Sequence, residues 1–129
     1  MNLLLDTHAA LWWWQDSPSL SARAREAMAD PANTIHFSAA SAYEIQQKLR
    51  LGKLGLPEKL HGEHLLREVA AEGWQTYPLH PAEAISAASI EHSHRDPFDR
   101  MLAAQTRIGG FTLLSRDPFF SDLGIDLLW

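Results

Sequence analysis

Three short runs of largely apolar residues constrain the fold of this chain more than any other feature of its sequence. They cover residues 2–5 (Asn-Leu-Leu-Leu), 34–37 (Thr-Ile-His-Phe) and 111–114 (Phe-Thr-Leu-Leu). Continuous runs of this length are typical of strands that are buried on both faces of a parallel sheet. Each run ends at a polar residue and is followed by residues that favour a helix, so strands and helices alternate along the chain.

The segments between these runs complete the α/β pattern. We expect helices over residues 8–14, 20–29, 39–51, 59–72, 81–91 and 97–108, and further strands over 74–79 and 125–128. Right-handed crossovers between parallel strands place helices on both faces of a sheet. The prediction is therefore a three-layer α/β/α sandwich, with a four- or five-stranded, mainly parallel sheet, formed by residues 1–129 as one domain.

Composition excludes several classes of protein. The chain has no cysteine, which rules out disulfides, thiolate metal sites and cysteine nucleophiles. Its seven histidines are scattered without the spacing of a zinc site. No run approaches the roughly 18 apolar residues of a membrane span, and no basic segment precedes an apolar stretch at the N-terminus. We expect a cytoplasmic protein without a membrane partner.

The net charge of −5 at first argues against a nucleic-acid partner. Five acids, however, stand at positions with a chemical interpretation: Asp6, Glu44, Asp96, Asp99 and Asp117. Without them the 16 acidic residues fall to 11, equal to the 11 basic ones. If these acids bind cations, the acidity is local and does not decide the partner.

Four of these acids are expected to meet at one edge of the sheet. Asp6 and Asp117 follow the first and third apolar runs, Glu44 follows the second within two helical turns, and Asp99 begins the helix that leads into the third. Ligands of such folds bind beyond the carboxyl ends of the strands. Clustered carboxylates raise one another's pKa unless a cation is present. All-oxygen ligands select Mg²⁺ or Mn²⁺, the ions of phosphodiester hydrolysis.

The same acids also have purely structural interpretations. Asp96 and Asp117 each precede a proline, which predicts a helix N-cap followed by proline at the first helical position. Asp99 would then complement the helix dipole, and Asp96 would pair with Arg100 four residues on. Thr7 is expected to cap the first helix.

For Glu44 two alternatives stay open. It forms a capping box with Ser41, or Ser38 caps the helix and Glu44 lies one turn further in. The basic residues Lys48, Arg50 and Lys53 follow, either as a solvated face or as contacts to phosphate. Trp12, Trp13 and Trp14 lie about 100° apart on a helix, so at least one is expected at the surface or at an interface.

The motifs together resemble a known family. Residues 3–8 (LLLDTH), 38–45 (SAASAYEI), 52–54 (GKL), 94–105 (HRDPFDRMLAAQ) and 113–117 (LLSRD) resemble PIN-domain ribonucleases and, among them, the VapC toxins of type II toxin–antitoxin systems. The resemblance runs in the same order from Met1 to Trp129. A rival class, the aspartyl-phosphate hydrolases, needs a second aspartate at position 8, where this chain has His8.

The resemblance implies a metal-dependent endoribonuclease that uses Mg²⁺ or Mn²⁺. Asp6, Glu44, Asp99 and Asp117 would form the catalytic and metal-binding quartet, with Asp6 and Asp99 as principal ligands. Asp117 would bind nearby or through water, and Glu44 would hold a second ion or orient the attacking water. Further candidates around the quartet are Asp96, Thr7 and Ser115, a position where many relatives have threonine.

The resemblance also implies partners. The RNA would contact Lys48, Arg50, Lys53 and Arg116. A VapB-type antitoxin would lay a segment across the acidic pocket, two copies of the chain would form a homodimer, and the free toxin would inhibit translation and growth. The alternative is a non-catalytic RNA- or partner-binding module that has the PIN fold without the chemistry, which predicts that metal binding and cleavage are absent.

Overall fold

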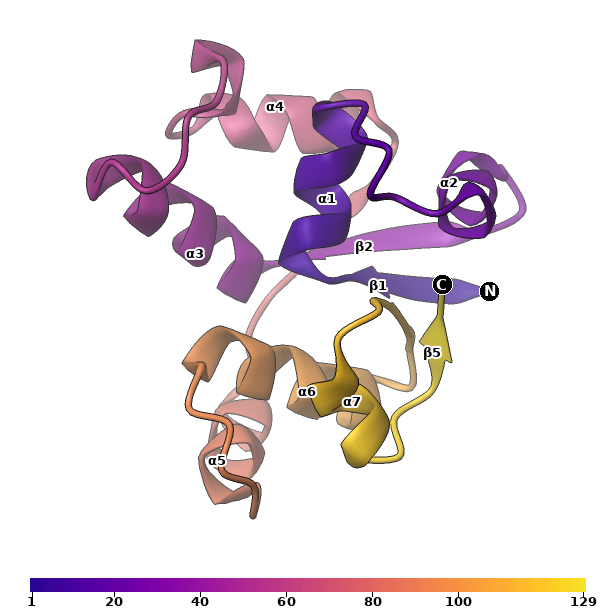
Figure 1. The fold of residues 1–129 in the computed structure, drawn as a ribbon, viewed down its shortest axis with the longest axis vertical. Coiled ribbons are helices and arrows are strands. Elements are labelled where there is room, and N and C mark those ends of the chain that lie inside the picture. Colours follow the sequence, from indigo (N-terminus) through magenta and orange to yellow (C-terminus); the bar gives the residue numbers. More distant parts are fainter.

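Five parallel strands form the centre of the protein, described here for residues 1–129 by a computed structural model (Figure 1). The strands are β1 (Asn2–Leu5), β2 (Thr34–Ser38), β3 (Gln75–Tyr77), β4 (Thr112–Leu114) and β5 (Leu127–Leu128). Their order in the sheet is β3-β2-β1-β4-β5, and every neighbouring pair is parallel. The central strand β1 has helices on both sides, which explains why Leu3, Leu4 and Leu5 are fully buried.

Helices cover both faces of the sheet, as Figure 1 shows. One face carries α1 (Thr7–Trp14), α2 (Ala22–Ala29), α3 (Ala39–Arg50) and α4 (His64–Ala71), with a short 3₁₀ turn at Glu58–Leu60. The other carries α5 (Pro81–Ser89), α6 (Pro97–Gly109) and α7 (Pro118–Asp122). Leu3 and Leu5 belong to the larger core and Leu4 to the smaller one. The predicted three-layer α/β/α fold is confirmed.

Three helix starts differ from the sequence-based prediction. The expected helix over 59–72 is a 3₁₀ turn followed by α4, because Gly62 adopts a positive φ of 59° between them. The helix expected from residue 20 begins at Ala22, since the Ser21 hydroxyl accepts a hydrogen bond from the Ala24 N–H. Thr7 is the first residue of α1 rather than its cap, a position taken by Asp6. No helix combines the length and the apolarity needed to cross a bilayer.

Arg100 fixes the segment that connects α5 to α6. Its guanidinium donates to the carbonyl oxygens of Ala87 (3.0 Å), His94 (2.9 Å) and Ile90. The expected pair between Asp96 and Arg100 is therefore wrong, because the guanidinium is turned toward these carbonyls. The Asp96 carboxylate instead caps α6, as its sequence position predicted. The connecting segment ends beside the acids described below.

Replacing Arg100 with leucine should destabilise the fold by about 2–4 kcal/mol, because partly buried carbonyls would lose charged donors. Arg107→Leu is the matched control on the same helix, where a single exposed bond to the Leu123 carbonyl is lost and a change within about 0.5 kcal/mol is expected. Urea denaturation followed by circular dichroism measures both. Equal effects of the two substitutions would contradict this account of the connecting segment.

Candidate functional site

The carboxyl edge of the sheet gathers the four acids of the predicted quartet. Asp6 follows β1 and Asp117 follows β4, while Glu44 lies in α3 after β2 and Asp99 lies in the first turn of α6. Asp6 and Glu44 are buried, with 6% and 3% of their surface exposed. The charges act on one another, since Asp6 and Asp117 raise the pKa of Asp99, and Glu44 raises that of Asp6. The structure thus brings the four side chains into one electrostatic cluster.

Only one of the two carboxylate oxygens of Asp6 accepts a hydrogen bond. The Ser115 hydroxyl donates to its Oδ2 at 2.7 Å, and the same hydroxyl accepts from the backbone N–H of Asp117 at 3.1 Å. Ser115 therefore links the two acids that follow β1 and β4. The second oxygen of Asp6, Oδ1, is buried and has no hydrogen-bond partner. A buried carboxylate oxygen without a partner is costly.

Glu44 repeats this half-paired arrangement. Ser38 caps α3, accepting from the Ala40 N–H at 3.0 Å, so the capping box with Ser41 is wrong and Glu44 lies one turn further in. The Lys48 ammonium lies 2.6 Å from Glu44 Oε2. Glu44 Oε1 is buried and has no partner. Two neighbouring acids thus each keep one buried oxygen free for a ligand.

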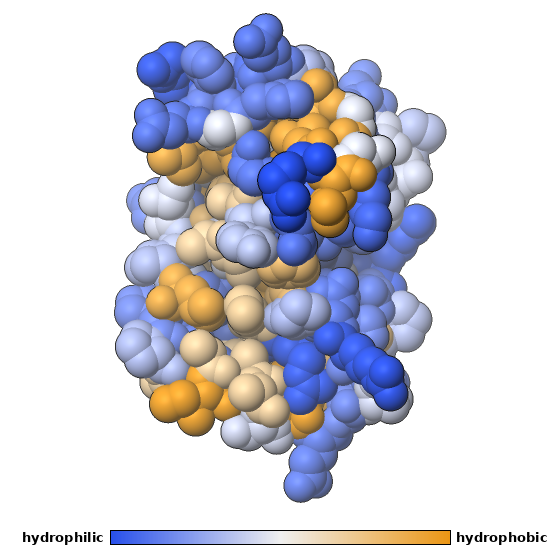
Figure 2. Space-filling view, turned by 90° about the vertical axis from the view of Figure 1, so that its left-hand side faces the viewer, coloured by the Kyte–Doolittle hydropathy of each residue, from blue (hydrophilic) through white to orange (hydrophobic).

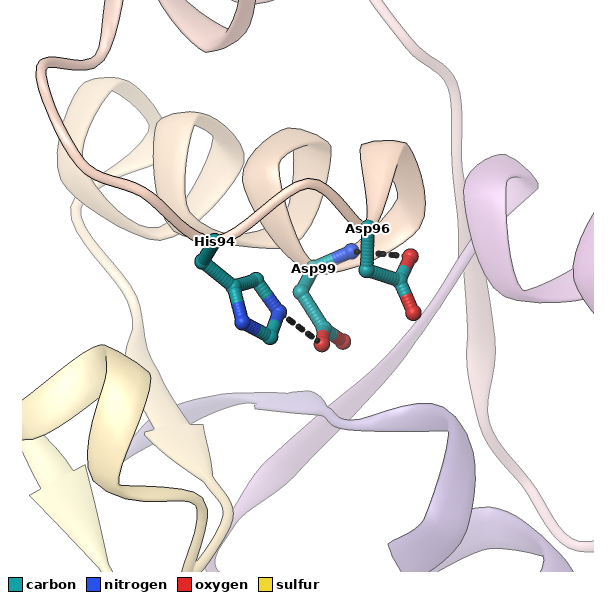
Figure 3. A group of neighbouring side chains, drawn as sticks. All are labelled: His94, Asp96 and Asp99. Carbon is teal, nitrogen blue, oxygen red and sulfur yellow. Dashed lines mark hydrogen bonds and ion pairs between the residues drawn. The ribbon is translucent and has the colours of Figure 1, made fainter.

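His94, Asp96 and Asp99 form a tighter group at the start of α6 (Figure 3). His94 Nε2 lies 2.8 Å from Asp99 Oδ2, and Asp96 Oδ1 accepts from the backbone N–H groups of Phe98 (2.8 Å) and Asp99 (3.3 Å). Figure 3 shows His94 and Asp99 directed at each other below the start of the helix. Zinc-type spacing of histidines does not single out His94; its place two residues before the N-cap of α6 is the sequence signal that does.

Burial and negative neighbours hold protons at this site. Burial raises the pKa of Asp99 to about 7, and the charges of Asp96, Asp6 and Asp117 add to the shift, while the hydrogen bond to His94 opposes it. The pKa of Asp6 is also raised, chiefly by burial, although its bond to Ser115 works in the other direction. Ionised carboxylates are therefore unfavourable here unless another positive charge is present.

A hard divalent cation suits these donors. The unpaired oxygens of Asp6 and Glu44 and the carboxylates of Asp99 and Asp117 offer an all-oxygen set, which Mg²⁺ and Mn²⁺ prefer. As a set the four do not lie within metal-ligand distance of one another. His94, Asp96 and Asp99 are the group whose ligand atoms all lie within 4.8 Å. Cation binding at the quartet would therefore draw the side chains closer.

The other predicted residues divide into those near the acids and those away from them. Arg116 and Lys48 lie close, Arg116 in a pocket of about 410 Å³ with Asp6 and Asp117, and Lys48 in its pair with Glu44. Arg50 and Lys53 are exposed at and beyond the end of α3. The Thr7 hydroxyl is buried against that of Ser41 at 2.8 Å, so it contacts α3 rather than a carboxylate.

The three consecutive tryptophans are all half-buried. Trp13 and Trp14 pack against Trp74, with ring centroids 6.2 and 5.3 Å apart. Trp12 instead borders the pocket that contains Asp6 and Asp117, beside the C-terminal Trp129. Trp12 is thus the tryptophan of the three that faces the acids.

Comparison with known proteins places the fold. The model of the PIN domain family matches residues 3–125. The chain is similar to a solved structure of VapBC2 from Rickettsia felis bound to a DNA fragment from its promoter, with a TM-score of 0.72, 14% identity and coverage of 99% of this chain and 98% of that one.

Two further solved structures are similar. For FitAB bound to an IR36 DNA fragment the TM-score is 0.59 with 19% identity, and 98% of this chain and 93% of that one are covered. For FitAcB from Neisseria gonorrhoeae the TM-score is 0.57 with 18% identity, and 98% and 96% are covered. Among curated proteins, no sequence matches this chain significantly.

The raised pKa of Asp99 predicts a pH-dependent stability. Because folding raises this pKa from 3.8 to about 7, the contribution of Asp99 is most favourable below about pH 4 and is lost as the pH rises through 7. In EDTA, the melting temperature should fall between pH 5.5 and pH 8. Asp99→Asn, which cannot ionise, should flatten this fall, and differential scanning fluorimetry measures both proteins. An unchanged slope in the variant would contradict the assignment.

Proposed function

This chain belongs to the PIN-domain family, and from that premise we propose that residues 1–129 form a single PIN domain that acts as a metal-dependent endoribonuclease. The observation that carries the proposal is the pair of buried, unpaired carboxylate oxygens, Asp6 Oδ1 and Glu44 Oε1. A protein that used these acids only as caps or surface charges would have no reason to bury them without partners.

Asp6 and Asp99 would be the principal ligands of Mg²⁺ or Mn²⁺, with Asp117 and Glu44 completing the site. The bound cation would lower the pKa of water and offset the charge of a phosphodiester. The chain's own contribution is orientation. Ser115 fixes the carboxylate of Asp6, and the Phe119 N–H fixes that of Asp117 at 2.9 Å. Lys48 holds Glu44 with one oxygen free.

His94 contacts the carboxylate of Asp99 directly. The imidazole Nε2 lies 2.8 Å from Asp99 Oδ2, so one proton can be shared between the two groups. A bound cation would favour the ionised form of Asp99 and so release the proton that this carboxyl group holds near neutral pH. His94 is held in turn by stacking on Phe119, with ring centroids 4.2 Å apart. We therefore assign His94 as a positioning residue for Asp99.

RNA is the proposed substrate because positive groups lie beside the acids. Arg116 lies in the acidic pocket and Lys48 lies on Glu44, while Arg50 and Lys53 would extend the contact to the phosphate backbone away from the site. The family premise and the structural similarity to VapBC2 and FitAB support a role as a toxin with a VapB-type antitoxin partner. Free of antitoxin, the protein would inhibit translation and growth.

A homodimer would cover the apolar face formed by α3, α5 and the start of α6. Figure 2 shows a band of apolar side chains running down this side of the molecule. A largely apolar pocket of about 630 Å³ lies between α3 and α6, and Tyr43 and Phe98 line it. Tyr43 is 63% exposed and Ile85 of α5 is 69% exposed. A face that combines an apolar pocket with exposed apolar side chains is typical of an interface.

Cleavage of single-stranded RNA of mixed sequence tests the proposed activity. Purified protein without antitoxin should cut in Mn²⁺ or Mg²⁺ and not in EDTA. Asp6→Asn and Asp99→Asn should each slow cleavage by at least about a hundredfold, because a cation contributes several kcal/mol to the transition state. Asp126→Asn makes the same change at an exposed aspartate outside the cluster and should cut like the wild type. Gel analysis of end-labelled RNA gives the rates.

Two results would contradict the nuclease. One is cleavage that persists in EDTA or in Asp99→Asn, which would identify a contaminant or a different chemistry. The other is a folded wild-type protein that neither binds Mn²⁺ nor cuts cellular RNA, which would favour the non-catalytic binding module.

The homodimer has a separate test. Tyr43→Asp places a charge on the proposed interface and should convert the dimer to a monomer, while Ile108→Asp changes a half-exposed residue near the end of α6, away from the start of that helix, and should leave the dimer intact. Light scattering after size-exclusion chromatography measures the mass. A monomeric wild-type protein, or a dimer that survives Tyr43→Asp, would be evidence against this interface.

A further inference from the structure

Two indoles and a guanidinium line the pocket that contains Asp6 and Asp117. The Trp12 and Trp129 rings meet edge to face, with centroids 5.8 Å apart at 65°. The Arg116 guanidinium carbon lies 4.7 Å from the centroid of Trp12 and 6.0 Å from that of Trp129. The same three side chains border the pocket of about 410 Å³. None of them takes part in the cation site described above.

The sheet topology brings these residues together. Adjacent strands β1, β4 and β5 end at the same edge, with Leu5 opposite Leu114 and Leu114 opposite Leu128. Arg116 follows β4 by two residues and Trp129 follows β5 directly. Trp12 reaches the same place from α1. The aromatic pair is therefore part of the edge at which the acids lie, not of the hydrophobic cores alone.

We propose that Trp12 and Trp129 form a stacking subsite for a nucleobase of the RNA substrate, next to the phosphate at the proposed cation site. This inference rests on the proposed nuclease function. The planar guanidinium of Arg116 over the Trp12 ring occupies the position that a base would take, because bases and guanidinium groups stack on the same aromatic faces. An exposed cation–π contact is weak enough to be exchanged for a base.

The spacing suits adjacent parts of one nucleotide strand. Asp6 stands at the N-cap position of α1 and Trp12 lies six residues further along, which is about 9 Å of helix axis at 1.5 Å per residue. A phosphate at the acids and a base at the indoles would thus be neighbours along an extended single strand. Arg116 is exposed. Once a base has taken its place over the Trp12 ring, its guanidinium would be free to contact a phosphate.

The mixed chemistry of the pocket favours RNA over a protein segment as its occupant. Carboxylates for a cation, a guanidinium for a phosphate and indoles for a base lie within one cavity. Stacking is tolerant of sequence and needs unpaired bases. The subsite therefore selects single-stranded RNA and leaves the identity of the base open.

Binding of two labelled oligomers separates stacking from charge. One is a single-stranded RNA of about eight nucleotides and the other is a ribose-phosphate strand of equal length without bases. In EDTA and low salt, where cleavage is absent, Trp12→Leu should raise the dissociation constant of the RNA roughly 5- to 100-fold. The same substitution should change the dissociation constant of the abasic strand by no more than about twofold, because only the contact to a base is lost. Fluorescence anisotropy measures both.

Three further variants serve as controls. Trp13→Leu makes the same change at the next residue of the same helix, where the ring packs on Trp74 instead, and should affect neither oligomer. Trp12→Phe keeps a stacking face and should restore most of the RNA affinity. If Trp12→Leu fails to fold, Trp129→Leu takes its place and should weaken binding of the RNA, but not of the abasic strand, in the same way. Melting temperatures verify the fold of each protein.

Equal weakening of both oligomers by Trp12→Leu, or no weakening of either, would overturn the subsite. The proposed nuclease activity can be refuted independently of the stacking subsite. If the wild type discriminates the two oligomers but does not cut RNA in Mn²⁺, the stacking subsite stands without the nuclease. If it cuts and Trp12→Leu binds and cuts equally well, only the subsite is wrong.

Discussion

Negative charge buried at one edge of the sheet is the constraint on which the rest of the site depends. The central strand β1 delivers Asp6 into an environment where burial and the charge of Glu44 oppose its ionisation. The fold supplies only partial compensation. Ser115 satisfies one oxygen of Asp6 and Lys48 one oxygen of Glu44, and the second oxygen of each remains unpaired. That imbalance is what a divalent cation would relieve.

The helices that enter the site have a double role. Asp96 and Asp117 cap α6 and α7 through backbone N–H groups, so the positive ends of two helices lie at the acidic edge. The capping interpretation and the chemical one are therefore compatible rather than exclusive. The carbonyls bound by Arg100 connect the same edge to α5, which makes the position of His94 a property of the fold and not of a free loop.

Local patterns were sufficient for most of the fold. The uninterrupted run Asn2–Leu5 predicted a strand buried on both faces, and Asp96-Pro97 and Asp117-Pro118 predicted two helix starts. What local patterns missed depended on contacts distant in sequence or on competition between similar signals. Ser38 and Ser41 were equal as caps of α3 until the end of β2 decided between them. The place of Trp12 beside Trp129 depends on a contact across nearly the whole chain.

The most direct test of the central claim, that Asp6 and Asp99 share a divalent cation, is the anomalous scattering of Mn²⁺ in crystals of the protein. We expect a peak bonded to carboxylate oxygens of both Asp6 and Asp99, with Glu44 and Asp117 nearby and His94 outside the coordination sphere. A peak held by His94, Asp96 and Asp99 without Asp6 would contradict it, because these three are the alternative group whose ligand atoms already lie close together. Ordered crystals with no peak at this edge would contradict it as well.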